Sequence, residues 1–330
     1  MSANVIQTRV LDAGGRFGLH PTWKDFGGEL DYYLFEPDPL EAERLRIKYE
    51  RRTDEIKVVE SALLDSIGET RIYMFRNQAM SSSHRRNPVS ALFKGEREQE
   101  VEIVGHIDAK TVTVDSFCKE QEISLDFMKI DTEGSEYAIL NGAINQLDNS
   151  VMGVRSEVNF DNIFEGTPLF STLHDFMLDH GYYILNLNYD GKGHYCNDAI
   201  NANGKYGILT ECDAVWLKRR EHIYSESHPS NGGVAIRTLK YAAFCLNNSA
   251  GDVALDMLLE ARREHELNFG DLIETRLYQF LDVAIHRLFY TLRWQPGQSI
   301  ETHKKIYFQI FDRPMKEMHE FNQSLEMNPS

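Results

Sequence analysis

The sequence has few cysteines, none of them in CxxC spacing, and it has no long apolar run. Its four cysteines are scattered along 330 residues, so neither a disulfide framework nor a complete set of zinc ligands is indicated. No apolar stretch approaches the roughly 20 residues that cross a bilayer, which predicts that the chain has no membrane span. We therefore expect a reduced, cytoplasmic protein. The cysteines are Cys118, Cys196, Cys212 and Cys245.

Positive charge is also scarce. The chain has 35 Lys and Arg residues against 51 Asp and Glu residues, which gives a formal net charge of −16. A surface this acidic repels a phosphate backbone, so we expect no nucleic-acid partner. The hydrophobic content of 42% is ordinary for a globular protein and suffices for a sizeable core.

Strands and helices alternate through the first two thirds of the chain. Apolar strands are predicted at 8–11, 32–35, 56–59, 71–75, 127–130 and 151–158, followed at 182–187 and 214–217 by a closing hairpin. Asp38 followed by Pro39 predicts a helix start, because an Asp cap before a proline is a frequent opening. This alternation predicts an α/β fold with a doubly wound parallel sheet, whose ligands bind at the carboxyl ends of the strands.

The pattern changes after residue 220. A polar segment at 225–233 contains Pro229 and two glycines and is typical of a linker, and only helical periodicity follows it. We predict a cofactor-binding domain at 1–220 and an all-helical extension at 221–330. The extension shows no chemistry of its own, so we interpret it as an oligomer interface or a substrate platform.

A glycine-rich turn follows the first strand. Asp12, Gly14, Gly15 and Gly18 form the pattern D-x-G-G-x-x-G, and Glu36 ends the next strand. Glycines let the backbone approach a ligand closely, and the acidic residue accepts hydrogen bonds from ribose hydroxyls. The spacing departs from the G-x-G-x-x-G of dinucleotide sites, and a carboxylate in the turn tolerates a sulfonium better than a pyrophosphate. The turn therefore favours S-adenosylmethionine over NAD.

A second block makes the assignment more specific. Residues 126–136, D-F-M-K-I-D-T-E-G-S-E, are followed by L-N-G-A at 140–143. The block resembles the K-I-D-x-E-G-x-E signature of FkbM-type methyltransferases. Further matches in the family's order are the glycine turn, F-E-P at 35–37, A-L-L-D at 62–65 and S-E-V at 156–158. The resemblance covers residues 8 to 218, and Gly15 and Arg16 depart from the usual Ala and Asn.

The resemblance implies a Rossmann-like, seven-stranded methyltransferase sheet that binds S-adenosylmethionine. It also implies O-methylation of a hydroxyl on a sugar, a glycan or a secondary metabolite. The cofactor-binding residues that it implies are Asp12, Gly14, Gly15, Gly18, Glu36, Pro37, Ser61, Ala62 and Asp131.

Acidic side chains at neighbouring strand ends are the candidates for catalysis. A hydroxyl is a poor nucleophile, so it needs a general base or a metal that lowers its pKa. Asp131, Glu133 and Glu157 are the catalytic candidates. Asp131 and Glu157, with Asn159, are candidate ligands of a cation of the Mg²⁺ type, which prefers oxygen. In the metal-free alternative, His20 or His84 is the base.

Several alternatives remain open. Glu136 begins a helix, where an acid also has a purely structural role. The polar segment 81–86 is either a solvated loop or a lid over the acceptor. An NAD-type oxidoreductase fits Glu36 but leaves the 131–136 block unused. A non-catalytic interaction protein on a methyltransferase fold is a further alternative, which the altered Arg16 allows. The sequence identifies neither the acceptor nor the atom that is methylated.

Overall fold

A computed structural model describes residues 6–24, 29–52, 55–90, 97–188, 193–194, 208–225, 233–293, 295–317 and 320–321. The chain divides into two compact units. One unit comprises residues 8–20 and 30–231, and the other comprises 1–7, 21–29 and 232–330. The units meet in sequence after the predicted boundary at residue 220, which falls inside a short helix, α8 (Arg220–Tyr224). Most of the predicted linker, and Cys196, lie outside the described residues.

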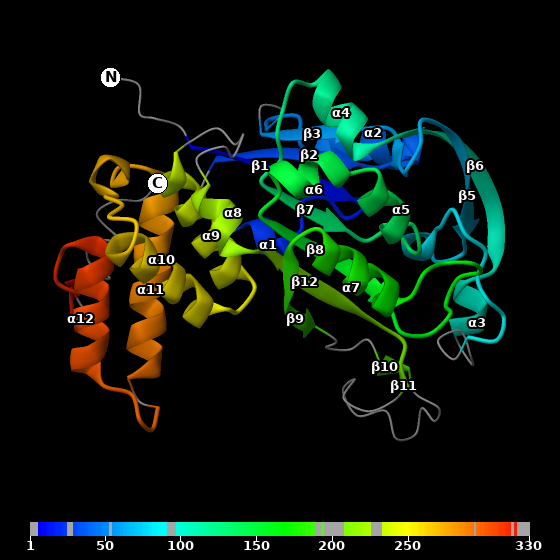
Figure 1. Cartoon of the computed structure of the whole chain (residues 1–330). Helices are drawn as coiled ribbons and strands as arrows, with labels where there is room; N and C mark the ends of the chain where they lie inside the picture. Colours follow the sequence, from blue (N-terminus) through cyan, green and yellow to red (C-terminus); the bar gives the residue numbers. More distant parts are fainter. Residues whose placement is uncertain are drawn as a thin grey trace. The chain divides into compact units, whose positions relative to one another are not determined.

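The larger unit is built on a seven-stranded sheet (Figure 1). The strand order is β3-β2-β1-β7-β8-β12-β9. β7 pairs in parallel with β1 and β8, while β12 is antiparallel to β8 and β9. The strands are β1 (Gln7–Ala13), β2 (Glu29–Phe35), β3 (Ile56–Val59), β7 (Phe127–Ile130), β8 (Gly153–Asn159), β9 (Tyr182–Asn188) and β12 (Glu211–Lys218). The predicted Rossmann-like, seven-stranded α/β fold is confirmed.

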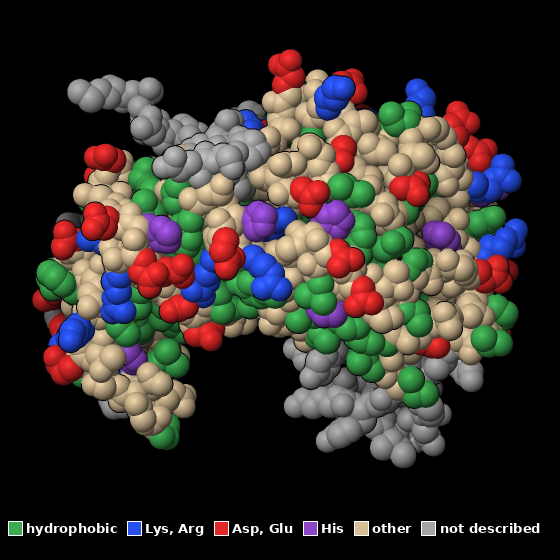
Figure 2. Space-filling view, in the orientation of Figure 1, with side chains coloured by type: hydrophobic (Ala, Val, Ile, Leu, Met, Phe, Trp, Pro, Cys, Tyr) green, Lys and Arg blue, Asp and Glu red, His purple; other side chains and the backbone are tan. Residues whose placement is uncertain are grey.

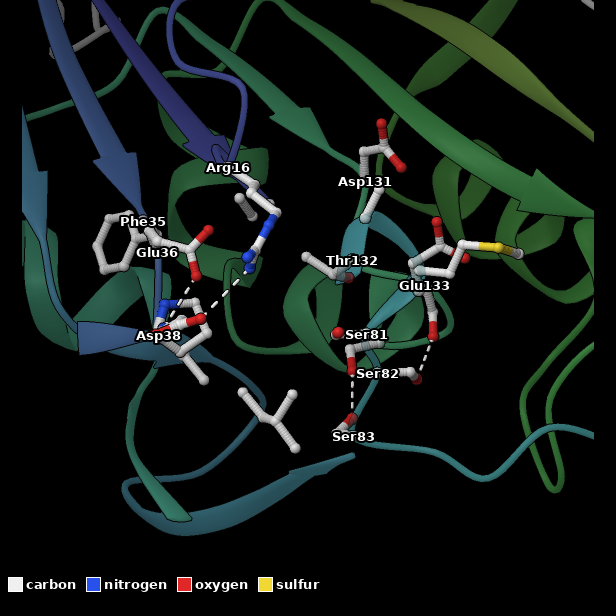
Figure 3. A pocket seen from close by; sticks show the side chains of 18 of the residues that line it. Arg16, Phe35, Glu36, Asp38, Ser81, Ser82, Ser83, Asp131, Thr132 and Glu133 are labelled. Carbon is white, nitrogen blue, oxygen red and sulfur yellow. Dashed lines mark hydrogen bonds and ion pairs between the residues drawn. The ribbon is translucent and has the colours of Figure 1, made fainter. Parts of the chain in front are cut away.

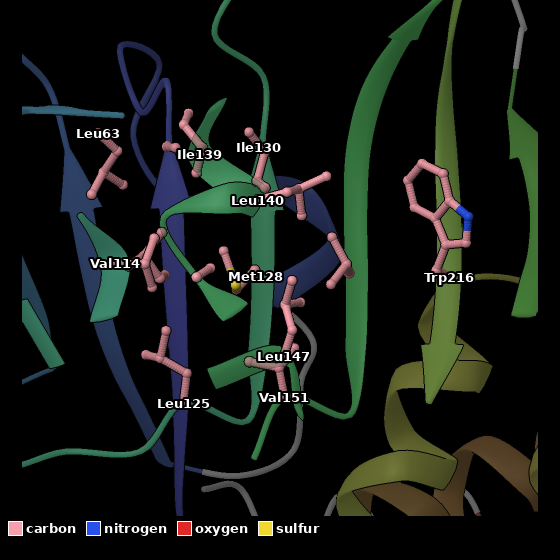
Figure 4. Packing of buried hydrophobic residues seen from close by; sticks show 14 of the residues in the cluster. Leu63, Val114, Leu125, Met128, Ile130, Ile139, Leu140, Leu147, Val151 and Trp216 are labelled. Carbon is pink, nitrogen blue, oxygen red and sulfur yellow. The ribbon is translucent and has the colours of Figure 1, made fainter. Parts of the chain in front are cut away.

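One face of this sheet packs against a row of helices (Figure 1). The strand residues on this face alternate, as in Leu11 and Ala13 of β1 and Met128 and Ile130 of β7. They share one hydrophobic core with helix residues such as Val114 (Figure 4). The helices are α4 (Val114–Glu120), α5 (Glu136–Asn141), α6 (Ile144–Asn149) and α7 (Phe170–Asp179); α2 (Pro39–Lys48) packs beside β3. This packing fixes the strand ends and therefore the polar residues that follow them.

A second, three-stranded sheet forms a side wall of the same unit. Its order is β4-β6-β5, and β5 and β6 form a long antiparallel hairpin. The strands are β4 (Ala62–Leu63), β5 (Gly68–Phe75) and β6 (Ile103–Val112), with the short helices η1 (Gln78–Met80) and α3 (Arg97–Glu100) between β5 and β6. A two-stranded pair, β10 (Gly193–His194) and β11 (Ile208–Leu209), lies farther along the chain.

Apart from the first residues of β1 and β2, Gln7 and Glu29, the regular elements of the smaller unit are helices in its described residues. Trp23 of α1 packs on Phe244 of α9, and the Asn247 side chain donates to the Thr22 carbonyl oxygen at 3.0 Å. These contacts explain why the α1 segment belongs with the C-terminal helices. The helices are α1 (Pro21–Lys24), α9 (Val234–Asn247), α10 (Gly251–Arg263), η4 (Gly270–Leu272), α11 (Arg276–Leu292) and α12 (Ile300–Phe311). No described helix has both the length and the hydropathy needed to span a membrane.

Charge on the molecular surface is mixed. On the face shown in Figure 2, the Lys and Arg side chains of the described residues stand among Asp and Glu side chains. They form no continuous basic area there. The predicted absence of a nucleic-acid partner remains a prediction.

Candidate functional site

A cavity of about 340 Å³ lies at the carboxyl ends of the central strands, entirely within the larger unit. This is the edge at which open α/β sheets bind their ligands, and the volume suits a small-molecule site. Eight of the predicted site residues line it: Gly14, Glu36, Pro37, Ser61, Ala62, Asp131, Glu133 and Glu157. Four others do not line it: Asp12, Gly15, Gly18 and Asn159. The fold therefore brings most of the predicted residues to one place.

The glycine turn allows two strand ends to approach each other. Gly14 has a φ of +84°, and a Cβ atom built on it would lie 1.7 Å from the carbonyl oxygen of Asp131. Gly15 donates its backbone N–H to Phe35 at 3.1 Å, and a Cβ there would collide with Leu34. Both positions thus need glycine, because β2 and the residue after β7 pass close to the turn. Of the three glycines of the turn, Gly14 is the one that lines the cavity.

Asp12 lies behind the cavity wall. Its side chain is fully buried, accepts a hydrogen bond from the Tyr32 hydroxyl, and lies 3.2 Å from Lys129 Nζ. Burial raises the pKa of Asp12, and the ammonium of Lys129 acts against that rise. The sequence predicted direct contact between Asp12 and the cofactor, but the structure places the carboxylate among protein groups and outside the cavity lining.

Glu36 lines the cavity at the end of β2 and is only 4% exposed. Its carboxylate accepts the backbone N–H of Asp38 at 2.9 Å. Burial raises the pKa of Glu36 to about 7. A buried carboxylate at a cavity wall is stabilised by hydroxyl donors from a ligand, so Glu36 is suited to hold a ribose.

Arg16 lines the cavity and points toward Asp38 (Figure 3). Its guanidinium lies 3.4 Å from Asp38 and donates to the Gln78 side chain at 2.5 Å. Asp38 also caps α2 by accepting from Leu40 N, as the sequence predicted. Arg16 therefore links the glycine turn and α2 to the η1 segment of the side wall. This bridge gives a physical role to one of the two departures from the family pattern.

The loop after β7 is held by the carboxylate of Glu136. That carboxylate is buried and accepts the backbone N–H of Thr132 at 2.8 Å and of Gly134 at 3.0 Å. Burial raises the pKa of Glu136. Between these two residues, Glu133 has a φ of +59°, in the left-handed region that a non-glycine residue rarely adopts. Glu136 thus has a structural role, and it holds Glu133 at the cavity.

Three carboxylates gather where β7 and β8 end. Asp131, Glu133 and Glu157 each place an oxygen atom within 4.8 Å of the other two. Figure 3 shows Asp131 and Glu133 on the side of the pocket opposite Glu36. Asn159 lies two residues beyond Glu157 on the same strand, and its side-chain oxygen is buried without a hydrogen-bond partner among the described residues. The arrangement can accept a proton or hold a cation.

The two histidines of the metal-free alternative do not line the cavity. Burial, with the nearby charges of Lys129 and Arg155, lowers the pKa of His20 to about 4. Burial also lowers the pKa of His84. A base whose pKa is this far below neutrality accepts a proton poorly, so His20 is a weak candidate beside the carboxylates.

Segment 81–83 forms a fixed wall of the cavity. Ser82 is buried, pairs with Tyr73 of β5, and donates its hydroxyl to the carbonyl oxygen of Glu133. The Ser83 and Ser135 hydroxyls lie 2.7 Å apart. The interpretation of this segment as a solvated loop is wrong for Ser82, because its backbone pairs with β5 and its side chain bonds to the loop after β7. Neither Arg85 nor Arg86 lines the cavity.

The β5–β6 hairpin supplies cavity residues that the sequence did not single out. Thr70, Ile72 and Met74 alternate along β5 and line the cavity together with Ile107 of β6, which pairs with Ile72. These β5 residues recur at every second position, and the sequence could have shown that they share one face, because side chains alternate along a strand. The cavity is therefore lined by apolar side chains of β5 and β6 as well as by carboxylates.

Comparison with known proteins gives one family match and several weak structural similarities. Methyltransferase FkbM from Methylobacillus flagellatus KT is 14% identical with a TM-score of 0.36, covering 64% of this chain and 44% of that one. The METTL16 MTase domain is 12% identical, with a TM-score of 0.33 and coverages of 66% and 62%. A putative sarcosine dimethylglycine methyltransferase from Galdieria sulphuraria is 12% identical, with a TM-score of 0.34 and coverages of 66% and 81%. The chain thus spans less than two thirds of the first two structures.

The family model matches the part of the chain that contains the motifs described above. No curated protein matches the chain. The sequence model described as Methyltransferase FkbM domain matches residues 12–184, which is more than half of the chain. This range begins in the glycine turn and includes Glu36, the block at 126–136 and Glu157. The chain therefore belongs to the FkbM methyltransferase family.

Proposed function

We propose that this protein transfers a methyl group from S-adenosylmethionine to a hydroxyl of a sugar, a glycan or a secondary metabolite. The observation that carries the proposal is the convergence of Gly14, Glu36 and Asp131 on one cavity of about 340 Å³. Family membership supports methyl transfer, and the acceptor class is the one that the resemblance to this family implies.

The residues of the cavity fit the cofactor. Gly14 presents backbone without a Cβ, and Glu36 offers a buried carboxylate to ribose hydroxyls. Pro37, Ser61 and Ala62 line the adjoining wall, where an adenine would lie. When bound, S-adenosylmethionine supplies a methyl group already activated by a sulfonium. The task of the chain is then to align an acceptor oxygen and to remove its proton.

The carboxylates at the end of β7 and β8 are suited to the acceptor. We assign Asp131, Glu133 or Glu157 as the group that takes the proton of the attacking hydroxyl while the oxygen gains the methyl group. Their oxygen atoms lie within 4.8 Å of one another, so a single acceptor hydroxyl would be within reach of several. The hydroxyls of Ser81 and Ser83 line the same cavity and are suited to position further polar groups of the acceptor.

A second candidate role for the same carboxylates is to bind a divalent cation. The spacing of Asp131, Glu133 and Glu157 suits a hard cation with oxygen ligands, and Glu133 joins the set that the sequence suggested. Asn159, predicted as a third ligand, has a buried side-chain oxygen without a partner among the described residues. Treatment with EDTA separates the two roles: activity that is lost and restored by Mg²⁺ supports the cation, and unchanged activity supports a carboxylate base.

The first experiment is to measure binding and turnover separately. Isothermal titration with S-adenosylhomocysteine and with NAD distinguishes the methyltransferase from the oxidoreductase alternative, and the first is expected to bind. Transfer of a labelled methyl group is then followed over a panel of hydroxylated and amine-bearing acceptors, with NMR to identify the methylated atom. Methylation of nitrogen only would overturn the hydroxyl assignment. Binding without turnover on any acceptor would support the non-catalytic alternative.

Three further proposals concern the helical extension, the location of the protein and its partners. The helical extension at 221–330 is proposed to form an oligomer interface or a substrate platform. The cytoplasmic location and the absence of a nucleic-acid partner are likewise proposals. Light scattering of the purified protein gives the oligomeric state, and a monomer would leave only the platform role.

A further inference from the structure

A row of polar side chains lies across the central strands next to the glycine turn. Asp12 of β1 stands directly opposite Lys129 of β7 in the parallel register, and Lys129 stands opposite Arg155 of β8. On the other side, Tyr32 of β2 donates its hydroxyl to Asp12. Because side chains alternate along a strand, Asp12 and Lys129 face away from the core that their apolar neighbours share with the helices.

Lys129 connects this row to the cavity. Its ammonium lies 3.2 Å from Asp12, 3.5 Å from Asp131 and 3.4 Å from the carbonyl oxygen of Gly14. Asp131 and Gly14 line the cavity, whereas Asp12 does not. One buried cation is therefore shared between a carboxylate behind the wall and two groups that form the wall.

Asp12 and Lys129 form a buried ion pair. Asp12 is fully buried and Lys129 is 6% exposed, so neither charge is solvated by water. A buried ion pair tolerates the loss of both partners better than the loss of one, because a single remaining charge is left uncompensated. The position of Lys129, and with it that of Asp131, is thus tied to the charge of Asp12.

We propose that Lys129 is a positioning residue of the methyl-transfer site and that Asp12 acts on this site only through Lys129. The proposal rests on the proposed function, since the site being positioned is the S-adenosylmethionine site. Lys129 holds the Asp131 carboxylate and the Gly14 carbonyl in the orientation that the cofactor meets. Asp12 fixes the ammonium without touching the ligand.

The test is a double-mutant cycle of Asp12→Asn and Lys129→Met, read by two measurements. Thermal unfolding reports stability, and isothermal titration with S-adenosylhomocysteine reports cofactor affinity. Lys129→Met is expected to lower the melting temperature, and the double variant is expected to recover most of that loss. Cofactor affinity is expected to fall about tenfold or more with Lys129→Met, the scale of a lost hydrogen bond to a charged group. This affinity is not expected to return in the double variant.

A double variant that recovers stability but not cofactor affinity is a result that a merely structural role of Lys129 would not produce. In the Lys129→Met background, Asp12→Asn is expected to leave affinity unchanged. An equal loss of affinity from Asp12→Asn in both backgrounds would show direct contact with the cofactor and overturn the proposal. If Lys129→Met does not fold, the comparison of the double variant with wild type decides: a double variant that binds S-adenosylhomocysteine as tightly as wild type would also overturn the proposal.

Lys218 offers a matched control. It is a second buried lysine, at the end of β12, and it donates to the Leu147 and His180 carbonyl oxygens at 2.7 and 2.6 Å. Lys218→Met is expected to lower stability and leave cofactor affinity unchanged; an equal loss of affinity would reduce the Lys129 effect to a general loss of folding. Wild-type protein that binds S-adenosylhomocysteine but methylates no hydroxyl would refute the acceptor assignment and leave this cycle intact.

Discussion

The buried carboxylate of Glu36 makes cofactor binding depend on pH near neutrality. Its pKa is about 7, against 4.5 for a solvated glutamate, chiefly because of burial. Arg16 and the backbone N–H of Asp38 lower this pKa, and the carboxylates of Asp38 and Glu41 on α2 raise it. Ribose hydroxyls donate to the ionised carboxylate, so the ionised form is the one that binds the cofactor. Since half of the sites are protonated near pH 7, we expect affinity to fall about tenfold between pH 8 and pH 6.

The raised pKa of Glu36 also makes stability depend on pH, in the opposite direction: acidification is expected to weaken cofactor binding but to favour folding. The folded-state pKa lies above the unfolded value, so Glu36 favours folding while it is protonated. That stabilisation is fully present below pH 4.5 and is lost as the pH rises through about 7. The difference corresponds to about 3 kcal/mol. Glu36→Gln, which stays neutral, is therefore expected to be more stable than wild type at pH 8.5 and similar to it at pH 4.5, as measured by urea denaturation.

Titration calorimetry with S-adenosylhomocysteine from pH 6 to pH 8 is the decisive assay. Wild type is expected to lose affinity on acidification, while Glu36→Gln is expected to have a flat profile over the same range. Glu36→Ala is expected to weaken binding by about 1.5–3 kcal/mol at pH 8, the scale of hydrogen bonds to a charged group. A Glu36→Gln profile as steep as that of wild type would refute the reasoning, because another group would then carry the titration.

Three further variants test the backbone of the site. Gly14→Ala is expected to unfold at a clearly lower temperature than Gly166→Ala and to lose cofactor binding. Both positions have positive φ, but of the two only Gly14 lies against other backbone, that of Asp131; equal melting temperatures would contradict this. Glu133→Gly is expected to stabilise by about 1 kcal/mol and to reduce methyl transfer, whereas Glu122→Gly, also left-handed, should stabilise without reducing it. Glu136→Gln is expected to lower stability by about 1–3 kcal/mol in urea, because two backbone N–H groups lose a charged acceptor.

Local elements were predictable because their causes are local. Asp38 caps α2, and Pro39 stands at its first position, as expected. The hairpin predicted from two apolar runs is the antiparallel pair of β9 and β12. The block at 126–136 marks the loop where the cavity carboxylates lie. In each case a few neighbouring residues carry the signal.

Other features depend on residues far apart in the chain. Asp12 was predicted at the cofactor, yet its partners are Tyr32 and Lys129. Nothing in the turn itself indicates that its carboxylate points behind the cavity wall. The membership of the α1 segment in the helical unit depends likewise on contacts with α9, more than 200 residues away. Pairings of this kind require the register of the sheet and the packing of its faces.

The sequence by itself determined the strands of the seven-stranded sheet, the glycine turn and the identity of the carboxylates at the strand ends, whereas β6 (Ile103–Val112) was not predicted. Tertiary structure alone decided which of those carboxylates face the cavity, that Glu133 adopts a left-handed backbone, and that residues of β5 and β6 line the same cavity. The physical reason is the range of the forces involved. Capping and periodicity act within a few residues, whereas burial and ion pairing depend on which strands lie side by side.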